Sequence, residues 1–180
     1  MKTTLITILI LFSLTTVKSQ IIKIGQDKIQ INGRQLDSTS LIMDYINALG
    51  QPSSIKNLIN NIYLFDSLGI YIYEDYKDNN KIIEISFDFK KDNEYDFSPK
   101  KTFKGKIYLT DYNCELSRHT SYRRLKKICN ENNNKTLQME FGDADFNYGN
   151  FNLLFEQGFL RTSTSNFTLD FKARKYKYIQ

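Results

Sequence analysis

Apolar residues follow two spacings along the chain, and each spacing predicts one kind of element. Apolar residues three or four apart predict helices, and strict alternation with polar residues predicts half-buried strands. The expected helices cover residues 41–49 and 122–129. The expected strands lie at 29–31, 35–36, 62–65, 70–74, 81–89, 103–109, 114–116, 136–141, 150–156 and 166–171. The chain should therefore be an α+β protein.

Turn and cap residues sharpen the boundaries of the first elements. Asn32-Gly33 is a dipeptide typical of a tight hairpin, because both residues tolerate positive φ. Asp37, Ser38 and Ser40 are good N-cap residues for the first helix. Gly50 and Pro52, which follow its last residue, should end the helix.

The element order occurs twice. Residues 20–98 and 99–180 each read as strand, strand, helix and further strands, with a charged linker at 90–101. We expect two similar units, an internal duplication, with antiparallel sheets each covered by one short helix.

The first 19 residues have the three parts of a secretory signal peptide. A short positive start precedes the apolar run 5–17, and Val17-Lys18-Ser19 suits a signal peptidase that cuts before Gln20. The alternative is an uncleaved membrane anchor, but thirteen apolar residues are short for a bilayer. We expect an exported protein, periplasmic or secreted, with no later transmembrane segment.

Charge is distributed unevenly between the two halves. Residues 20–98 hold 8 basic and 12 acidic residues, whereas residues 99–180 hold 15 and 8. A basic surface can meet an acidic partner, or it can simply keep a protein soluble. Export argues against nucleic acid, so an unknown protein or an acidic envelope component is the expected partner. The candidate binding residues are Arg118, Arg123, Arg124, Lys126, Lys127, Lys172, Arg174, Lys175 and Lys177.

The two cysteines, Cys114 and Cys129, belong to a chain expected in an oxidising compartment, so a disulfide is a candidate. Cys114 and Leu116 share one strand face, and Cys129 lies on the apolar stripe of the second helix. Both thiols should therefore point into one small core. The alternative is two buried free thiols.

Catalytic motifs are absent from the sequence. The single histidine, His119, stands in a loop without a serine or cysteine at a recognised spacing. Asp143, Asp145 and Asn147 are similar to the start of a calcium loop, but the following glycine comes one residue late. We therefore interpret 142–150 as a polar connecting loop, with calcium as the weaker alternative, and expect no cofactor.

Three segments carry a resemblance to a known family: LGQP, FDSLGIYIYE and FSPKKTFKGKIYL. Together they resemble an uncharacterised family of bacterial proteins, one of the numbered domains of unknown function. The resemblance implies an α+β bacterial domain and no activity. Asp37-Ser38-Thr39 and Asp66-Ser67-Leu68 are also similar to O-glycosylation triplets of Bacteroidota envelope proteins.

These observations favour an exported, non-enzymatic binding protein of unknown partner, of an inhibitor or immunity type. The alternatives are an envelope hydrolase that uses acidic residues such as Asp143 and Asp145, and a structural envelope protein attached through Lys172 to Lys177.

Overall fold

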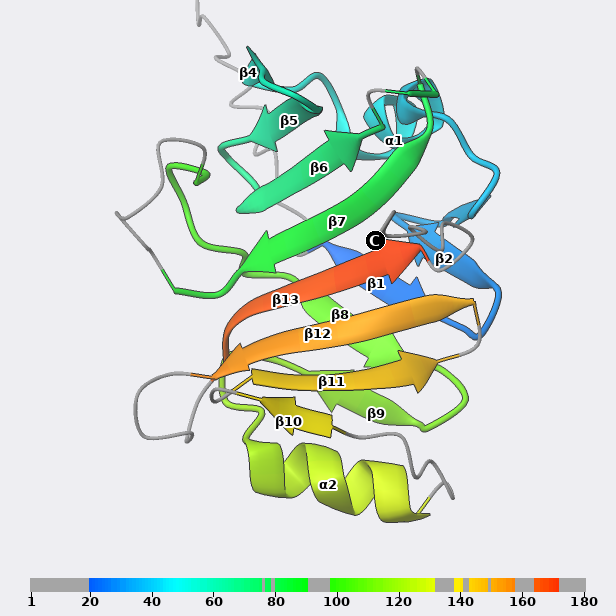
Figure 1. The fold of residues 1–180 in the computed structure, drawn as a ribbon, viewed down its shortest axis with the longest axis vertical. Helices are drawn as coiled ribbons and strands as arrows, with labels where there is room; N and C mark the ends of the chain where they lie inside the picture. The colour runs from blue at the N-terminus through cyan, green and yellow to red at the C-terminus, as the bar shows by residue number, and fades with distance from the viewer. Residues whose placement is uncertain are drawn as a thin grey trace, which may run out of the picture.

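The fold is a sandwich of two sheets with a helix near each end of the smaller sheet (Figure 1). This computed structural model describes residues 20–75, 77–78, 80–90, 98–131, 138–140, 143–148, 150–157 and 164–171. Strands dominate these residues, in agreement with the predicted α+β class. None of the helices among them has the length and apolar character needed to cross a membrane.

The smaller sheet has five strands in the order β3-β2-β1-β8-β9. Their bounds are β1 (Ile21–Ile24), β2 (Lys28–Ile31), β3 (Arg34–Asp37), β8 (Lys106–Leu109) and β9 (Cys114–Leu116). Neighbours within each half run antiparallel, but β1 and β8 run parallel. We expected antiparallel sheets, and this sheet is mixed because a long crossover, not a hairpin, joins β1 to β8.

The larger sheet has eight strands in the order β10-β11-β12-β13-β7-β6-β5-β4, all antiparallel. Their bounds are β4 (Ser54–Asn57), β5 (Asn61–Phe65), β6 (Ile70–Glu74), β7 (Ile82–Asp88), β10 (Gln138–Glu140), β11 (Asp143–Tyr148), β12 (Phe151–Gln157) and β13 (Thr164–Phe171).

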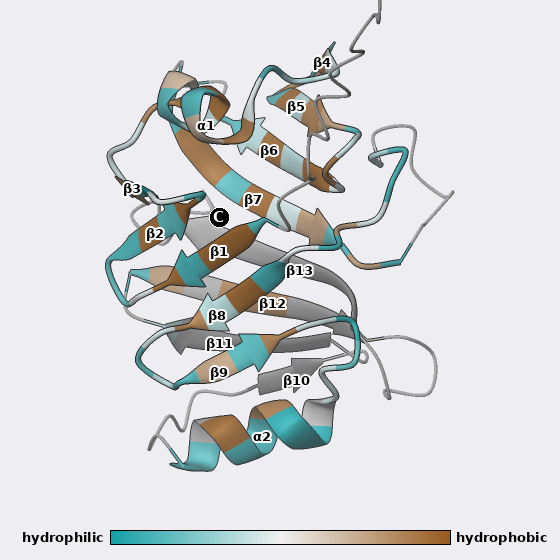
Figure 2. Ribbon diagram, turned by 180° about the vertical axis from the view of Figure 1, so that it is seen from behind, coloured by the Kyte–Doolittle hydropathy of each residue, from teal (hydrophilic) through white to brown (hydrophobic). Residues whose placement is uncertain are grey.

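The core lies between the two sheets. Alternation turns Ile22 and Ile24 of β1 inward, where they join a cluster with Phe87 of β7 and Phe151 of β12, all fully buried. The two helices, α1 (Ile42–Leu49) and α2 (Tyr122–Glu131), contribute to the same cluster. Figure 2 shows their positions at opposite ends of the smaller sheet. Each sheet is therefore covered mainly by the other sheet, and the helices close the two ends.

Strands from both sides of the predicted boundary at 98/99 enter both sheets. In the first half three strands, a helix and a four-strand meander follow one another, and in the second half a two-strand hairpin, a helix and four strands do. However, β7 and β13 run antiparallel whereas β1 and β8 run parallel. A two-fold rotation that carries β7 onto β13 would make β1 and β8 antiparallel, so one rotation does not relate the halves. The duplication stays a prediction from connection order.

Two tight turns depend on positive φ. Asn32 (φ 50°) and Gly33 (φ 88°) form the predicted hairpin turn between β2 and β3. Gly69 (φ 69°) allows a close approach, because a Cβ there would lie 2.1 Å from the backbone nitrogen of Phe103. Glycine is the residue that permits both geometries.

The start of α1 differs from the prediction. α1 follows Leu41, whose N–H donates to Asp44 Oδ2 at 2.9 Å. Asp37 does not cap the helix but accepts hydrogen bonds from the N–H of Thr39 at 2.8 Å and from its hydroxyl at 2.6 Å. The helix start is held instead by a hydrogen bond from Ile42 N–H to the Asn80 carbonyl oxygen at 2.7 Å.

Three strands were not predicted. β1 and β4 are short, and all four residues of β4 are exposed, so β4 shows no burial alternation. β11 occupies the segment interpreted as a polar loop. That interpretation was wrong, because the carboxylates hid the alternation of Ala144, Phe146 and Tyr148.

Candidate functional site

Hydroxyl groups fix the loop that leads into α2. The Ser117 N–H donates to Thr120 Oγ1 at 2.9 Å, and the Thr120 N–H returns to the Ser117 carbonyl oxygen at 2.9 Å. Ser121 Oγ accepts from the Arg124 N–H at 3.4 Å, which supplies a partner in the first turn. Leu125 and Ile128 then bury the apolar side of the helix in the core. The other described side chains of α2 are exposed: Arg123, Arg124, Lys126, Lys127, Asn130 and Glu131.

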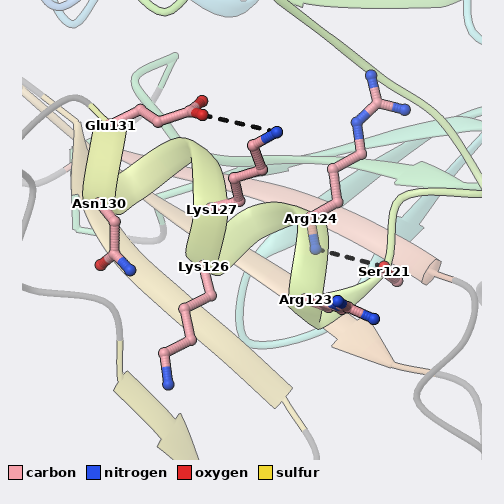
Figure 3. Close-up of a pocket in the computed structure, with 7 residues that line it drawn as sticks. All are labelled: Ser121, Arg123, Arg124, Lys126, Lys127, Asn130 and Glu131. Carbon is pink, nitrogen blue, oxygen red and sulfur yellow. Dashed lines mark hydrogen bonds and ion pairs between the residues drawn. The ribbon is translucent and has the colours of Figure 1, made fainter.

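The solvent side of α2 borders a hollow of about 580 Å³. Four cations line it, with Ser121, Asn130 and Glu131 as the other described lining residues; the cations are Arg123, Arg124, Lys126 and Lys127. In Figure 3, Lys126 and Asn130 extend to one side of the helix axis, and Lys127 and Glu131 extend to the other. The hollow thus has cationic groups on both sides of the helix. We call these seven residues the α2 hollow.

The positive charge of the α2 hollow is only partly neutralised. Lys127 and Glu131 form an ion pair at 3.7 Å, with both side chains more than half exposed. An exposed pair of this kind contributes about 0–1 kcal/mol to stability. Among the described residues, α2 forms no other ion pair. Arg123 and Lys126 form no ion pair with any of the described residues.

Arg118 and His119 stand in the loop before α2. Arg118 Nε donates to His119 Nε2 at 3.1 Å, and the His119 N–H donates to Ser117 Oγ at 3.3 Å. His119 is thereby an acceptor on an exposed loop. Five of the predicted binding residues therefore lie close together in the sequence, on α2 and the loop before it: Arg118, Arg123, Arg124, Lys126 and Lys127.

Cys114 lies beneath the helix with a buried free thiol. Burial raises the pKa of this thiol, and the charge and hydrogen bond of Arg124 oppose the increase. This places the Arg124 guanidinium close to β9. The backbone of Cys129 belongs to α2, but its side chain lies outside the described residues. Cys114 is thus unbridged in this structure, and its disulfide with Cys129 stays a prediction for the oxidised protein.

The other candidates fall partly or wholly outside the described residues. Lys172, Arg174, Lys175 and Lys177 belong to the segment 172–180, of which the structure describes nothing. The calcium candidates Asp143, Asp145 and Asn147 lie on strand β11. A strand spaces alternate residues along one face, whereas a calcium loop curls them around the ion. Their side chains are not among those described, so calcium also stays a prediction.

The described residues offer no group of three or more His, Cys, Asp or Glu side chains that could hold a metal. Glu74, the most deeply buried carboxylate among the side chains whose burial is described, accepts hydrogen bonds from Tyr63 Oη at 2.8 Å and Asn61 Nδ2 at 2.7 Å. The Asn80 N–H also donates to it. Glu74 is thus a structural acceptor that ties the β6–β7 hairpin to β5. Burial, together with the hydrogen bond to Glu74, raises the pKa of Tyr63 to about 12.

A family model, Domain of unknown function (DUF7738), matches residues 21–123, more than half of the chain. The chain belongs to the DUF7738 family. This confirms the resemblance to a numbered domain of unknown function. The matched segment contains β1 to β9 and ends at the first residues of α2, so most of the α2 hollow follows it. No curated protein and no solved structure gives a match.

Sequence patterns identified the cations of α2 but not the residues that surround them. The helical spacing of Leu125 and Ile128 left Arg123 and Lys126 on the solvent side, as predicted. Ser121 and Asn130 were not recognised as lining residues. The contact between Arg124 and Cys114 depends on how β9 packs beneath the helix, which no local pattern contains.

Proposed function

We propose that this DUF7738 protein is an exported, non-enzymatic binding protein whose α2 hollow engages an acidic protein, in the manner of an inhibitor or immunity protein. The observation that carries the proposal is the hollow itself, with four cations and one carboxylate at one end of the two-sheet sandwich. Export rests on the N-terminal sequence pattern.

The chemistry of the lining residues favours carboxylates as the recognised groups. An arginine guanidinium can donate two parallel hydrogen bonds to one carboxylate, and a lysine adds a point charge with a flexible reach. Arg123 and Lys126 are exposed, and the helix that holds them is anchored by buried Leu125. A preorganised cationic surface of this kind steers an acidic partner and speeds association.

Capture of a partner from envelope and culture-medium extracts at low and high salt tests the proposal. The informative variant replaces Arg123, Lys126 and Lys127 with Gln, which removes charge and keeps the length of the side chains close to the original. Arg124 is left in place because it contacts Cys114.

The matched control replaces Lys23, Lys28 and Lys106 with Gln. These lysines are exposed and lie in β1, β2 and β8 of the smaller sheet, away from α2. The wild type and the control should capture the same acidic protein at low salt and release it at about 1 M salt, where the Debye length is roughly 3 Å. The α2 variant should capture at least about tenfold less, as expected when buried charge contacts are lost. Equal capture by all three chains would refute the α2 hollow as the binding surface.

A further inference from the structure

The turn between β2 and β3 contains an Asn-Gly dipeptide, which occurs once in the sequence. Within the described residues, positive φ outside glycine is confined to three exposed asparagines: Asn32 (φ 50°), Asn80 (φ 73°) and Asn113 (φ 45°). Asparagine tolerates this conformation better than most residues do. The residue that follows differs at each position: Gly33, Lys81 and Cys114. Asn32 therefore combines exposure, positive φ and a glycine neighbour.

A glycine after an asparagine favours one reaction of the amide side chain. The backbone nitrogen of the following residue, once it has lost its proton to solvent, attacks the side-chain Cγ. A new N–Cγ bond closes a five-membered succinimide ring, and the Cγ–Nδ2 bond breaks as the amide nitrogen takes up a proton and leaves as ammonia. A Cβ on the following residue hinders the attack, and glycine has none. Water then adds to either ring carbonyl and leaves aspartate or isoaspartate.

The surroundings of Gly33 leave room for this ring to close. Gly33 is exposed, and a Cβ built on it would have no atom within 4 Å beyond its chain neighbours. At Gly69, by contrast, the same atom would lie 2.1 Å from the backbone nitrogen of Phe103. The backbone at Gly33 can therefore change conformation without displacing a neighbouring segment.

The nitrogen that leaves in this reaction has a structural role. Asn32 Nδ2 donates to the carbonyl oxygen of Ala48 at 3.1 Å, in the last turn of α1. The last four carbonyl groups of a helix lack partners within the helix, so this donor satisfies one of them. The product carboxylate has no proton to donate at neutral pH, and its charge lies at the negative end of the helix. α1 has no basic residue in its last turn to offset that charge.

The isoaspartate product also alters the main chain. The chain then passes through the side-chain carboxyl group, which adds one carbon atom to a tight turn. In the unmodified turn, Ile31 is opposite Arg34, and the Asn32 N–H donates to the Ile21 carbonyl oxygen at 3.3 Å. The geometry of a turn fixes the register of its hairpin. Both products therefore remove the contact with α1, and isoaspartate disturbs the hairpin as well.

We propose that Asn32 is a site of spontaneous deamidation, with water as the co-reactant, and that the reaction releases the β2–β3 turn from α1. The reaction needs no enzyme, so the converted fraction increases with the age of the protein. α2 lies at the opposite end of the smaller sheet, and the change is therefore independent of the α2 hollow (Figure 2).

Peptide mapping of the full chain tests the reaction. The protein is held at mildly acidic and mildly alkaline pH and then digested with trypsin, which cuts after lysine and arginine. Residues 29–34 form one peptide, and residues 107–118, which contain Asn113, form another. Deamidation raises the mass of a peptide by one unit, and an isoaspartate methyltransferase labels the isoaspartate.

The peptide 29–34 should convert at least about tenfold faster than the peptide 107–118, because Gly33 has no Cβ to hinder the attack. Its conversion should be faster at alkaline pH, where the backbone nitrogen loses its proton more readily. Equal conversion of the two peptides, or conversion that does not depend on pH, would overturn the assignment of the site.

Hydrogen exchange tests the release of the turn from α1. Asn32→Asp reproduces one product, and Asn113→Asp, the matched control, makes the same change at another exposed position of positive φ. Loss of one hydrogen bond should speed exchange at Leu49 and Gly50 by about two- to tenfold in Asn32→Asp, and the control should leave it unchanged. Unchanged exchange in Asn32→Asp, or an equal increase in both variants, would refute the release. Deamidated wild-type protein, separated by its added negative charge, should exchange as Asn32→Asp does and gives the same comparison without a substitution.

Discussion

The two helices bury similar apolar stripes and differ in what they present to solvent. α1 buries Ile42, Tyr45, Ile46 and Ala48 and carries Asp44 as its single charged residue. α2 buries Leu125 and Ile128 and carries four cations and a carboxylate. Because α1 closes its end of the sandwich without cations, closure does not require them. The charge on α2 is the feature on which the proposed binding role rests.

The loops before the helices differ in a related way. Asp37 holds the turn before α1 with a carboxylate, whereas Thr120 and Ser121 hold the turn before α2 with hydroxyl groups. Only the first of these arrangements can titrate. The two ends of the molecule should therefore respond differently to acid.

The largest expected effect tests whether α2 is as much a part of the core as α1. Leu125→Ala removes a fully buried side chain and leaves a cavity. It should lower the free energy of unfolding by about 2–5 kcal/mol, measured by urea denaturation. A change below about 0.5 kcal/mol would mean that α2 is a surface attachment to the sandwich.

A smaller effect is expected where the β6–β7 hairpin supports α1. Glu74→Gln keeps one acceptor oxygen but places an amide group among donors from Tyr63, Asn61 and Asn80. Leaving such groups unsatisfied should cost about 1–3 kcal/mol. Because Ile42 donates to the Asn80 carbonyl, hydrogen exchange should increase at the start of α1 and not in α2. Equal changes in both helices would contradict this coupling.

The pH dependence separates the two ends further. The hydrogen bonds from Thr39 lower the pKa of Asp37 below its usual 3.8. A carboxyl with a lowered folded pKa stabilises the fold above its unfolded pKa, and this contribution is lost as the pH falls through the folded pKa. Below about pH 4, hydrogen exchange should rise at the α1 end before the α2 end. Asp37→Asn should remove the difference, and a difference that persists in this variant would assign it to another group.

The smallest effect concerns the solvent side of α2. Gln at Arg123 and Lys126 should change the free energy of unfolding by less than about 0.5 kcal/mol, as for most surface substitutions. The variant that also replaces Lys127 with Gln should lose partner capture, as proposed above. A loss of stability as large as that of Leu125→Ala would show that the cations belong to the fold.

Local signals explain which parts of the fold were predictable. Asn32-Gly33 fixed a hairpin through backbone conformation, and the spacing of Leu125 and Ile128 fixed the exposed side of α2. Both are properties of a few consecutive residues. The sheet pairings are not local properties, because β1 and β8 are about 85 positions apart. The sequence of neither strand indicates which strand it pairs with.

The site shows the same limit. Charged residues were recognisable as candidates, but their grouping was not. The net charge of each half suggested an acidic first half and a basic second half, whereas the sheet register brings Glu84 of the first half next to Asp170 of the second. These two positions become neighbours only after β7 and β13 have paired, and no local pattern in either strand contains that pairing.

The two junctions between the halves, β1 with β8 and β7 with β13, also govern when the protein can fold. The second junction joins strands about 80 positions apart, and β13 is the last strand of the chain. Pairings this distant in sequence carry a large loop-closure cost and slow folding. The first half alone supplies only β6 as a neighbour of β7, so the larger sheet is completed only once β13 is available. The pairing of β7 with β13 must therefore wait until synthesis of the chain is nearly complete.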